Sequence, residues 1–226
     1  SSAEHKASTM NTLSEHDFWL FDLDGTVVDA SWTYTRSVFD EVGTRLERNF
    51  SDTEAEILWH GLQGNRNPLL RSWGLDPEQF WDVFHTVEDP QMRAEATYLH
   101  DDAASVIREV LDNDIPVGVV THCQDFLAQP VLSHLGIHNW FETVVTCTPD
   151  LGWKPDPAPV YHAIEQLSTV ELAQDTGVLI GDSASDIGAA WNAGLTGVHV
   201  ERHSPDIRGQ CVIADHRVKQ LTDLLN

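Results

Sequence analysis

Three short apolar runs along the chain end abruptly in polar residues. The run "FWLFDLD" covers residues 18–24, "IPVGVVTH" covers residues 115–122, and "GVLIGDS" covers residues 177–183. Runs that are apolar throughout are typical of parallel strands that are covered on both faces of a sheet. We therefore expect three buried strands, each leading into a polar loop.

Helical patterns lie between and after these strands. They cover residues 101–114, 124–136, 156–168 and 183–194. Alternation of strand and helix predicts an α/β fold built on a doubly wound, Rossmann-like parallel sheet.

The segment between the first two expected strands breaks this alternation, because it shows helical patterns and no convincing strand. The patterns lie at 32–50, 51–62 and 76–87, and the second opens with the capping-box pair Ser51 and Glu54. An all-helical cap is therefore expected to be inserted into the α/β core. The expected division is a core at 11–30 and 99–226, a helical cap at 31–98, and an extraneous or disordered stretch at 1–10.

The chain is strongly acidic, with 36 Asp and Glu against 13 Lys and Arg and a formal net charge of −23. Nucleic acids and anionic membranes are disfavoured as partners, because binding to them rests on clustered Lys and Arg. The acids are spread along the chain, which fits either an ordinary soluble surface or a high-salt cytoplasm in which salt screens the repulsion. Scarce lysine and abundant aspartate favour the halophilic interpretation.

Cysteine usage and hydropathy indicate the cellular compartment that is expected for the protein. Cys123, Cys147 and Cys211 are widely separated and contain no C-x-x-C pair, which argues against a disulfide framework or a zinc ribbon. No apolar run approaches the ~20 residues needed to cross a bilayer, and the start of the chain lacks the apolar segment of a signal peptide. We expect a soluble protein of the reducing cytoplasm.

Polar side chains gather at the ends of the three expected strands, namely Asp22 and Asp24, Thr121, and Asp182. Ligands of open α/β sheets bind at this edge, so one shared site is expected. Clustered carboxylates repel one another unless a divalent cation lies between them, and an oxygen-only set indicates Mg²⁺. A phosphate substrate would complete the coordination and would need a fixed cation on its other side. Lys154, one of only three lysines in the chain, is the candidate.

Four stretches resemble, in this order, the motifs of the haloacid dehalogenase superfamily: "FDLDGTVVD" at 21–29, "VVTH" at 119–122, "WKPDP" at 153–157 and "IGDSASD" at 180–186. The first is highly specific, because D-x-D-G-T follows an apolar strand. The chain looks like the phosphatase branch with a helical cap inserted just after the first motif, similar to phosphoglycolate phosphatases and β-phosphoglucomutases. The resemblance implies a Mg²⁺-dependent phosphatase that acts on a small phosphorylated metabolite.

Carried over position by position, the resemblance makes Asp22 the nucleophile that accepts the phosphoryl group as an aspartyl-phosphate. Asp24 is implied to protonate the leaving oxygen and then to activate water. The carboxylates of Asp22 and Asp182 and the backbone carbonyl of Asp24 are implied to hold Mg²⁺.

The resemblance also implies a phosphate-binding set. Thr121 donates its hydroxyl to the phosphoryl group, Lys154 neutralises its charge, and Asp186 orients Lys154 or a metal-bound water. Taken singly, Thr121 would be an ordinary strand end, Lys154 a solvated surface lysine and Asp186 a helix cap.

Relatives with other chemistry remain to be distinguished. Dehalogenases need no acid two residues after the nucleophile, so Asp24 argues against that activity. Phosphonate hydrolases use a cap lysine, and residues 31–98 contain none. A phosphomutase of the β-phosphoglucomutase type shares all four motifs and stays open as an alternative. A non-catalytic binding module is disfavoured because no motif carboxylate is missing.

Substrate selectivity is expected to come from polar cap residues that face the site, several of them in the loop-like stretch "HGLQGNRNPLL" at 60–70. The candidates are Arg36, His60, Asn65, Arg66, Asn67 and Arg71.

Two other pairs resemble reactive sites only superficially. His122 and Cys123 follow Thr121, but adjacent strand residues point to opposite faces, so packing and backbone roles are expected for them. His134 and His138 have helical spacing without an accompanying acid, so a zinc site there is not expected.

Overall fold

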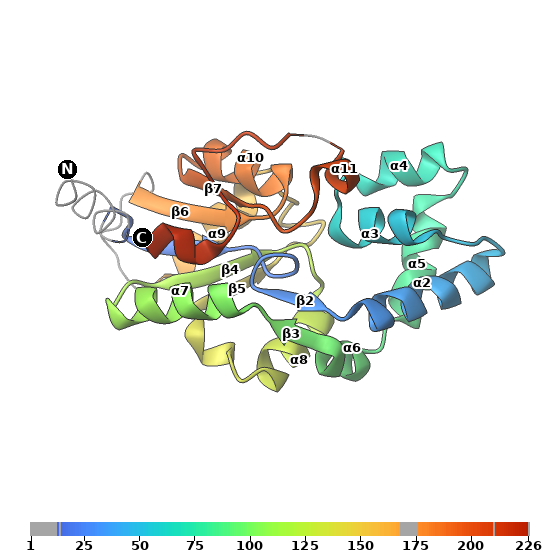
Figure 1. Ribbon diagram of the computed structural model, residues 1–226, viewed down its shortest axis with the longest axis horizontal. Helices are drawn as coiled ribbons and strands as arrows, with labels where there is room; N and C mark the ends of the chain where they lie inside the picture. Colours follow the sequence, from blue (N-terminus) through green and yellow to red (C-terminus); the bar gives the residue numbers. More distant parts are fainter. Residues whose placement is uncertain (1–12, 14, 168–175, 210, 226) are drawn as a thin grey trace.

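A six-stranded sheet with the order β5-β4-β1-β6-β7-β8 forms the centre of the molecule (Figure 1). Every adjacent pair in it is parallel. The chain builds outward from β1 first on one side and then on the other, as in doubly wound sheets. The strands are β1 (Phe18–Phe21), β4 (Val117–Thr121), β5 (Thr143–Thr146), β6 (Gly177–Gly181), β7 (Thr196–Val200) and β8 (His216–Val218).

The computed structural model describes residue 13 and residues 15–167, 176–209 and 211–225. The expected extraneous stretch at 1–10 lies outside these residues. Within the described part, no helix combines the length and apolarity that a bilayer crossing requires.

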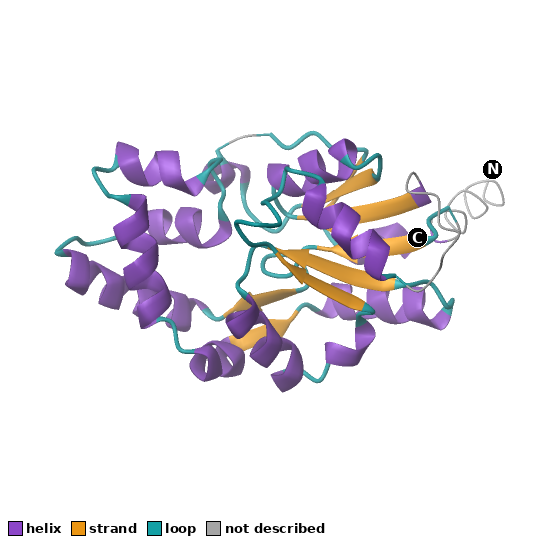
Figure 2. Cartoon of the chain, turned by 180° about the vertical axis from the view of Figure 1, so that it is seen from behind, coloured by secondary structure: helices purple, strands orange, loops and turns teal. Residues whose placement is uncertain are grey.

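Alternating side chains of the central strand enter two different apolar cores. Trp19 and Phe21 lie in the core under helices α7 and α8, whereas Phe18 and Leu20 lie in the core under α9 and α10. A strand buried on both faces has no polar alternation, which explains its uniformly apolar sequence. Figure 2 shows the strands with helices on either side. The helices are α7 (Asp101–Asp112), α8 (Asp125–His134), α9 (Ala158–Gln166) and α10 (Ala184–Asn192). The predicted α/β class and doubly wound sheet are confirmed.

Five helices form the cap between β2 (Val28–Ala30) and β3 (Thr97–Leu99). They enclose their own apolar cluster, which includes Phe39, Phe80 and Phe84, and Figure 1 shows α2 to α5 grouped away from the sheet. These helices are α2 (Trp32–Leu46), α3 (Asp52–His60), α4 (Arg66–Ser72), α5 (Pro77–Val87) and α6 (Pro90–Ala96).

The capping box expected at the start of α3 is present, with Ser51 and Glu54 bonding reciprocally. Two features of the cap differ from expectation. The stretch read as a loop contains α4, whose Leu70 is fully buried in the cap core. The predicted boundary at residue 98 falls inside β3, which pairs antiparallel with β2 so that the outgoing and returning chain run side by side.

Candidate active site

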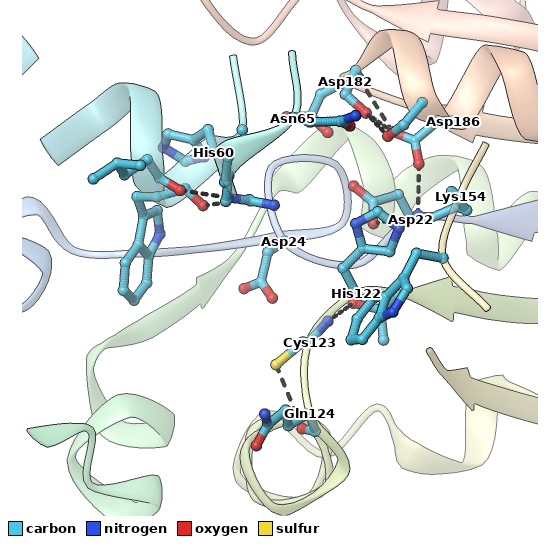
Figure 3. Close-up of a pocket in the computed structure, with 18 of the residues that line it drawn as sticks. Asp22, Asp24, His60, Asn65, His122, Cys123, Gln124, Lys154, Asp182 and Asp186 are labelled. Carbon is cyan, nitrogen blue, oxygen red and sulfur yellow. Dashed lines mark hydrogen bonds and ion pairs between the residues drawn. The ribbon is translucent and has the colours of Figure 1, made fainter. Parts of the chain in front are cut away.

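The residues expected at the strand ends converge on one cavity of about 830 Å³ between the sheet edge and the cap (Figure 3). Asp22 directly follows β1, Thr121 ends β4, and Asp182 directly follows β6. Lys154 comes from the loop between β5 and α9, and Asp186 from the first turn of α10. All five line the cavity.

Lys154 is buried among carboxylates, with only 4% of its surface exposed. Its Nζ donates to Asp22 Oδ1 at 3.0 Å, to Asp186 Oδ1 at 2.6 Å and to the carbonyl oxygen of Val120 at 2.8 Å. Burial disfavours the ammonium charge, but the carboxylates of Asp186 and Asp22 outweigh it and raise the pKa of Lys154. The lysine is therefore a fixed cation at the base of the cavity.

Asp186 is also tied to its own helix start. Ser183 donates to Asp186 Oδ2 from its backbone nitrogen at 3.2 Å and from its hydroxyl at 2.8 Å. One carboxylate oxygen thus caps the helix and the other holds Lys154. Asp186 thus makes both contacts that were considered from the sequence, one with its own helix start and one with Lys154.

The remaining carboxylates carry more negative charge than Lys154 neutralises. Burial and the carboxylate of Asp186 raise the pKa of Asp22 well above its ordinary value, against the opposing effect of Lys154. Burial and Asp186 likewise raise the pKa of Asp182 to about 7. Carboxylate oxygens of Asp22, Asp182 and Asp186 lie within 4.8 Å of one another. An oxygen-only set with unneutralised charge fits a hard divalent cation such as Mg²⁺.

Gly25 is required by this packing. It has φ of +84°, and a Cβ atom there would collide with the carboxylate of Asp182. The glycine of the D-x-D-G-T stretch therefore allows the loop after β1 to approach the strand that carries Asp182.

The hydroxyl of Thr121 accepts one hydrogen bond and can still donate another. Its Oγ accepts a hydrogen bond from the backbone nitrogen of Cys123 at 3.0 Å. That bond orients the side chain and leaves its proton available to a ligand in the cavity.

Asp24 is held by Arg93, a cap residue that no sequence motif indicates. Arg93 of α6 places Nη2 3.1 Å from Asp24 Oδ2 and Nη1 2.9 Å from both carboxylate oxygens of Glu88. Its guanidinium also lies over the ring of Trp59, 4.7 Å from the centroid, and Tyr34 donates to Glu88 at 3.1 Å. A buried arginine thus joins the cap to the loop after β1.

The expected selectivity residues divide into two groups. His60, Asn65, Arg66 and Asn67 line the cavity. Arg66 is anchored through Nε to the carbonyl oxygen of Leu58 at 2.7 Å and through Nη2 to that of Trp59 at 3.1 Å.

Arg36 and Arg71 are not brought to the cavity. Arg36 pairs with Asp40 and Asp52, both at 2.9 Å, and α2 contributes no residue to the cavity lining. Arg71 is exposed near the end of α4 and is not among the lining residues. The helix faces on which these arginines lie are set by cap packing, which the local sequence does not reveal.

His122 and Cys123 both line the cavity, which the expectation of packing and backbone roles did not include. The backbone role of Cys123 is present in its bond to Thr121. Burial and Lys154 lower the pKa of His122 to about 3, so its imidazole is neutral. Burial raises the pKa of the Cys123 thiol, against the effect of Arg93. A neutral thiol beside a neutral imidazole is not an activated nucleophile.

Comparisons with known proteins identify the family of the chain. Residues 19–200 match the haloacid dehalogenase-like hydrolase family. A phosphoglycolate phosphatase of Colwellia psychrerythraea is 27% identical over 198 residues, which cover 82% of this chain and 84% of the relative.

Solved structures share the fold. A Lactobacillus plantarum protein provisionally assigned as a phosphoglycolate phosphatase has a TM-score of 0.76 at 23% identity, with 93% of this chain and 98% of that chain covered. A haloacid dehalogenase-like hydrolase of Streptococcus pneumoniae has a TM-score of 0.73 at 18% identity, with 94% and 98% covered. The fold and the family agree with the four sequence motifs. The chain is an enzyme that belongs to the haloacid dehalogenase-like hydrolase family.

Proposed function

We propose that this hydrolase is a Mg²⁺-dependent phosphatase that cleaves a small phosphorylated metabolite through a phosphoryl group carried on Asp22. The observation that carries the proposal is the setting of Asp22. Its buried carboxylate lines the cavity, with Lys154 Nζ 3.0 Å from one oxygen and the carboxylates of Asp182 and Asp186 beside it. A carboxylate next to a fixed cation suits attack on an anionic ester. The phosphatases among the relatives support the same class.

In the first step, an oxygen of Asp22 bonds to phosphorus while the bond from phosphorus to the leaving oxygen breaks. Asp24 gives a proton to the leaving oxygen. In the second step, Asp24 takes a proton from water as that water attacks phosphorus, and the bond to Asp22 breaks to release phosphate. Arg93, 3.1 Å from Asp24, restrains the carboxylate between the two steps.

Thr121 and Lys154 would receive the phosphoryl oxygens. Thr121 offers the hydroxyl proton that its bond with Cys123 leaves available, and Lys154 offers positive charge from a position fixed by Asp186. Donors held in place before the reaction stabilise developing charge without reorganising.

The carboxylates of Asp22 and Asp182 and the backbone carbonyl of Asp24 would hold Mg²⁺. When bound, Mg²⁺ supplies positive charge that offsets the repulsion between the acid cluster and an anionic phosphate. The raised pKa values of Asp22 and Asp182 support a site that needs such charge.

The part of the substrate beyond the phosphate would meet the cap. His60, Asn65, Arg66 and Asn67 line that side of the cavity and supply hydrogen-bond donors together with one cation. Such groups suit a small hydroxylated or carboxylated metabolite. The three cysteines are unpaired, which fits our placement of the enzyme in a reducing cytoplasm.

The test is phosphate release from p-nitrophenyl phosphate and from a panel of small phosphorylated metabolites, with Mg²⁺ and with excess EDTA. We expect release with Mg²⁺ and none in EDTA or from Asp22→Asn. Undiminished release in EDTA would contradict the metal requirement. Interconversion of sugar phosphates without net phosphate release would favour the phosphomutase alternative.

A further inference from the structure

Two histidines from opposite sides of the cavity meet beside Asp182. His60 is the last residue of α3 in the cap, and His203 precedes α11 (Pro205–Arg208) in the core. Their ring centroids are 4.3 Å apart, and His203 Nε2 lies 2.9 Å from Asp182 Oδ2. One ring nitrogen of each histidine and one oxygen of Asp182 all lie within 4.8 Å of one another. Figure 3 labels His60 and Asp182 on the cap and core sides.

We propose that His60, His203 and Asp182 form a second metal site that binds a divalent transition-metal cation of the Zn²⁺ type and ties the cap to the core. Two imidazoles and one carboxylate suit Zn²⁺ and its first-row neighbours, whereas Mg²⁺ favours oxygen ligands. This site is chemically distinct from the oxygen-only site and shares Asp182 with it.

The candidate ligand atoms lie near the spacing that a metal site requires. Zn²⁺ bonds to nitrogen and oxygen at about 2.0–2.2 Å, so neighbouring ligand atoms of a tetrahedral site lie roughly 3.3 Å apart. The pair of His203 and Asp182 is already at 2.9 Å, and the nitrogen of His60 is within 4.8 Å.

Asp29 supplies a second carboxylate close to His60. Asp29 is buried, and its Oδ2 pairs with His100 Nε2 at 2.6 Å. Its Oδ1 is buried without a hydrogen-bond partner and lies 3.8 Å from His60 Nδ1. A metal on the other ring nitrogen would make Nδ1–H a stronger donor toward Asp29. Carboxylates commonly support ligating histidines in this way, and a small shift of His60 toward Asp29 would give the unpaired oxygen a donor.

A metal bound by His60 and His203 would connect the cap to the core. Near the same edge, Gln63 of the cap donates to the carbonyl oxygen of Ile207 in the core at 3.4 Å. A cation on His60 and His203 would add a coordination bridge to this contact and hold the cap closed. Because Asp182 serves both sites, occupancy of the second site would also change the affinity of the first site for Mg²⁺.

The experiment measures binding and does not depend on turnover, so it can fail independently of the proposed phosphatase activity. Protein is stripped with EDTA, saturated with Mg²⁺ and titrated with Co²⁺, and the bound Co²⁺ is then displaced with Zn²⁺. The visible absorption of Co²⁺ reports binding, because it strengthens when nitrogen atoms coordinate the ion in a site of low symmetry. We expect one equivalent of Co²⁺ to bind. His60→Ala and His203→Ala should each weaken binding by at least about tenfold, and Asp29→Asn by about tenfold.

His134→Ala is the matched control, because His134 is an exposed histidine at the end of α8. Its Co²⁺ titration should match that of wild type. Circular dichroism checks each variant, and His60→Gln or His203→Gln replaces an alanine variant that does not fold. Absence of the Co²⁺ band in wild type, its persistence in both histidine variants, or equal loss in His134→Ala would overturn the proposal.

Discussion

The Nζ atom of Lys154 lies 2.6 Å from Oδ1 of Asp186, and both side chains are almost completely buried. The same ammonium lies 3.0 Å from Asp22. Isolated buried charges are costly, so each of these groups depends on the others. The lysine therefore stays charged although it is buried, and its position is fixed, whereas a surface lysine is mobile.

Lys154→Ala should lower kcat/KM by about 10²-fold or more, the scale for losing a preorganised electrostatic contact. Lys154→Arg should restore little, because a planar guanidinium has a different reach and needs more room than a compact ammonium between Asp22 and Asp186. Steady-state kinetics at saturating Mg²⁺ compare the three proteins. An alanine variant within threefold of wild type would remove Lys154 from the mechanism.

The loss of the buried ion pair of Arg93 and Glu88 should cost more stability than the loss of an exposed ion pair. Arg93→Met leaves the carboxylate of Glu88 without its cation in a site where Glu88 is 5% exposed, so a loss of about 3–5 kcal/mol in the free energy of unfolding is expected. Urea denaturation provides the measurement.

Arg45→Met is the control, because Arg45 pairs with Glu41 on an exposed helix face and should cost below about 1 kcal/mol. The double variant Arg93→Met with Glu88→Leu should regain part of the loss, since the buried charge of Glu88 is then removed together with its partner. Equal costs for Arg93→Met and Arg45→Met would show that burial of the pair is unimportant.

The acidic surface predicts a response to salt. With a net charge of −23, KCl should raise Tm by screening self-repulsion. Most of the gain in Tm should come below about 1 M KCl, because the Debye length has fallen to ~3 Å at that concentration. Thermal unfolding in a KCl series checks this. A Tm that is flat or falls with KCl would leave the high-salt interpretation without support.

The parts of the fold that could be predicted are those with strong local patterns. Strands β1, β4 and β6 are buried along their whole length, so their sequences are unambiguous. The sequence "TVVT" of β5 alternates in burial, and the sequence "HRV" of the edge strand β8 has no buried residue. Such short and partly polar strands cannot be distinguished from loops before their partners are known.

The parts of the site that could be predicted are those that follow strand ends. Asp22, Thr121 and Asp182 follow from the rule that parallel strands end at one edge. Arg93 could not be placed, because its contact with Asp24 joins segments far apart in the sequence. Its only local signal is Asp89 and Pro90, which cap a short helix just before the chain returns to the core.

The central claim is that Asp22 carries the phosphoryl group. The most direct test quenches the enzyme during turnover of p-nitrophenyl phosphate with Mg²⁺ and treats it with borohydride, which reduces an acyl phosphate to an alcohol. Peptide mass spectrometry should then find homoserine at position 22, absent without substrate and absent in Asp22→Asn. Active enzyme with unmodified Asp22, or with the reduced residue at another position, would contradict the account.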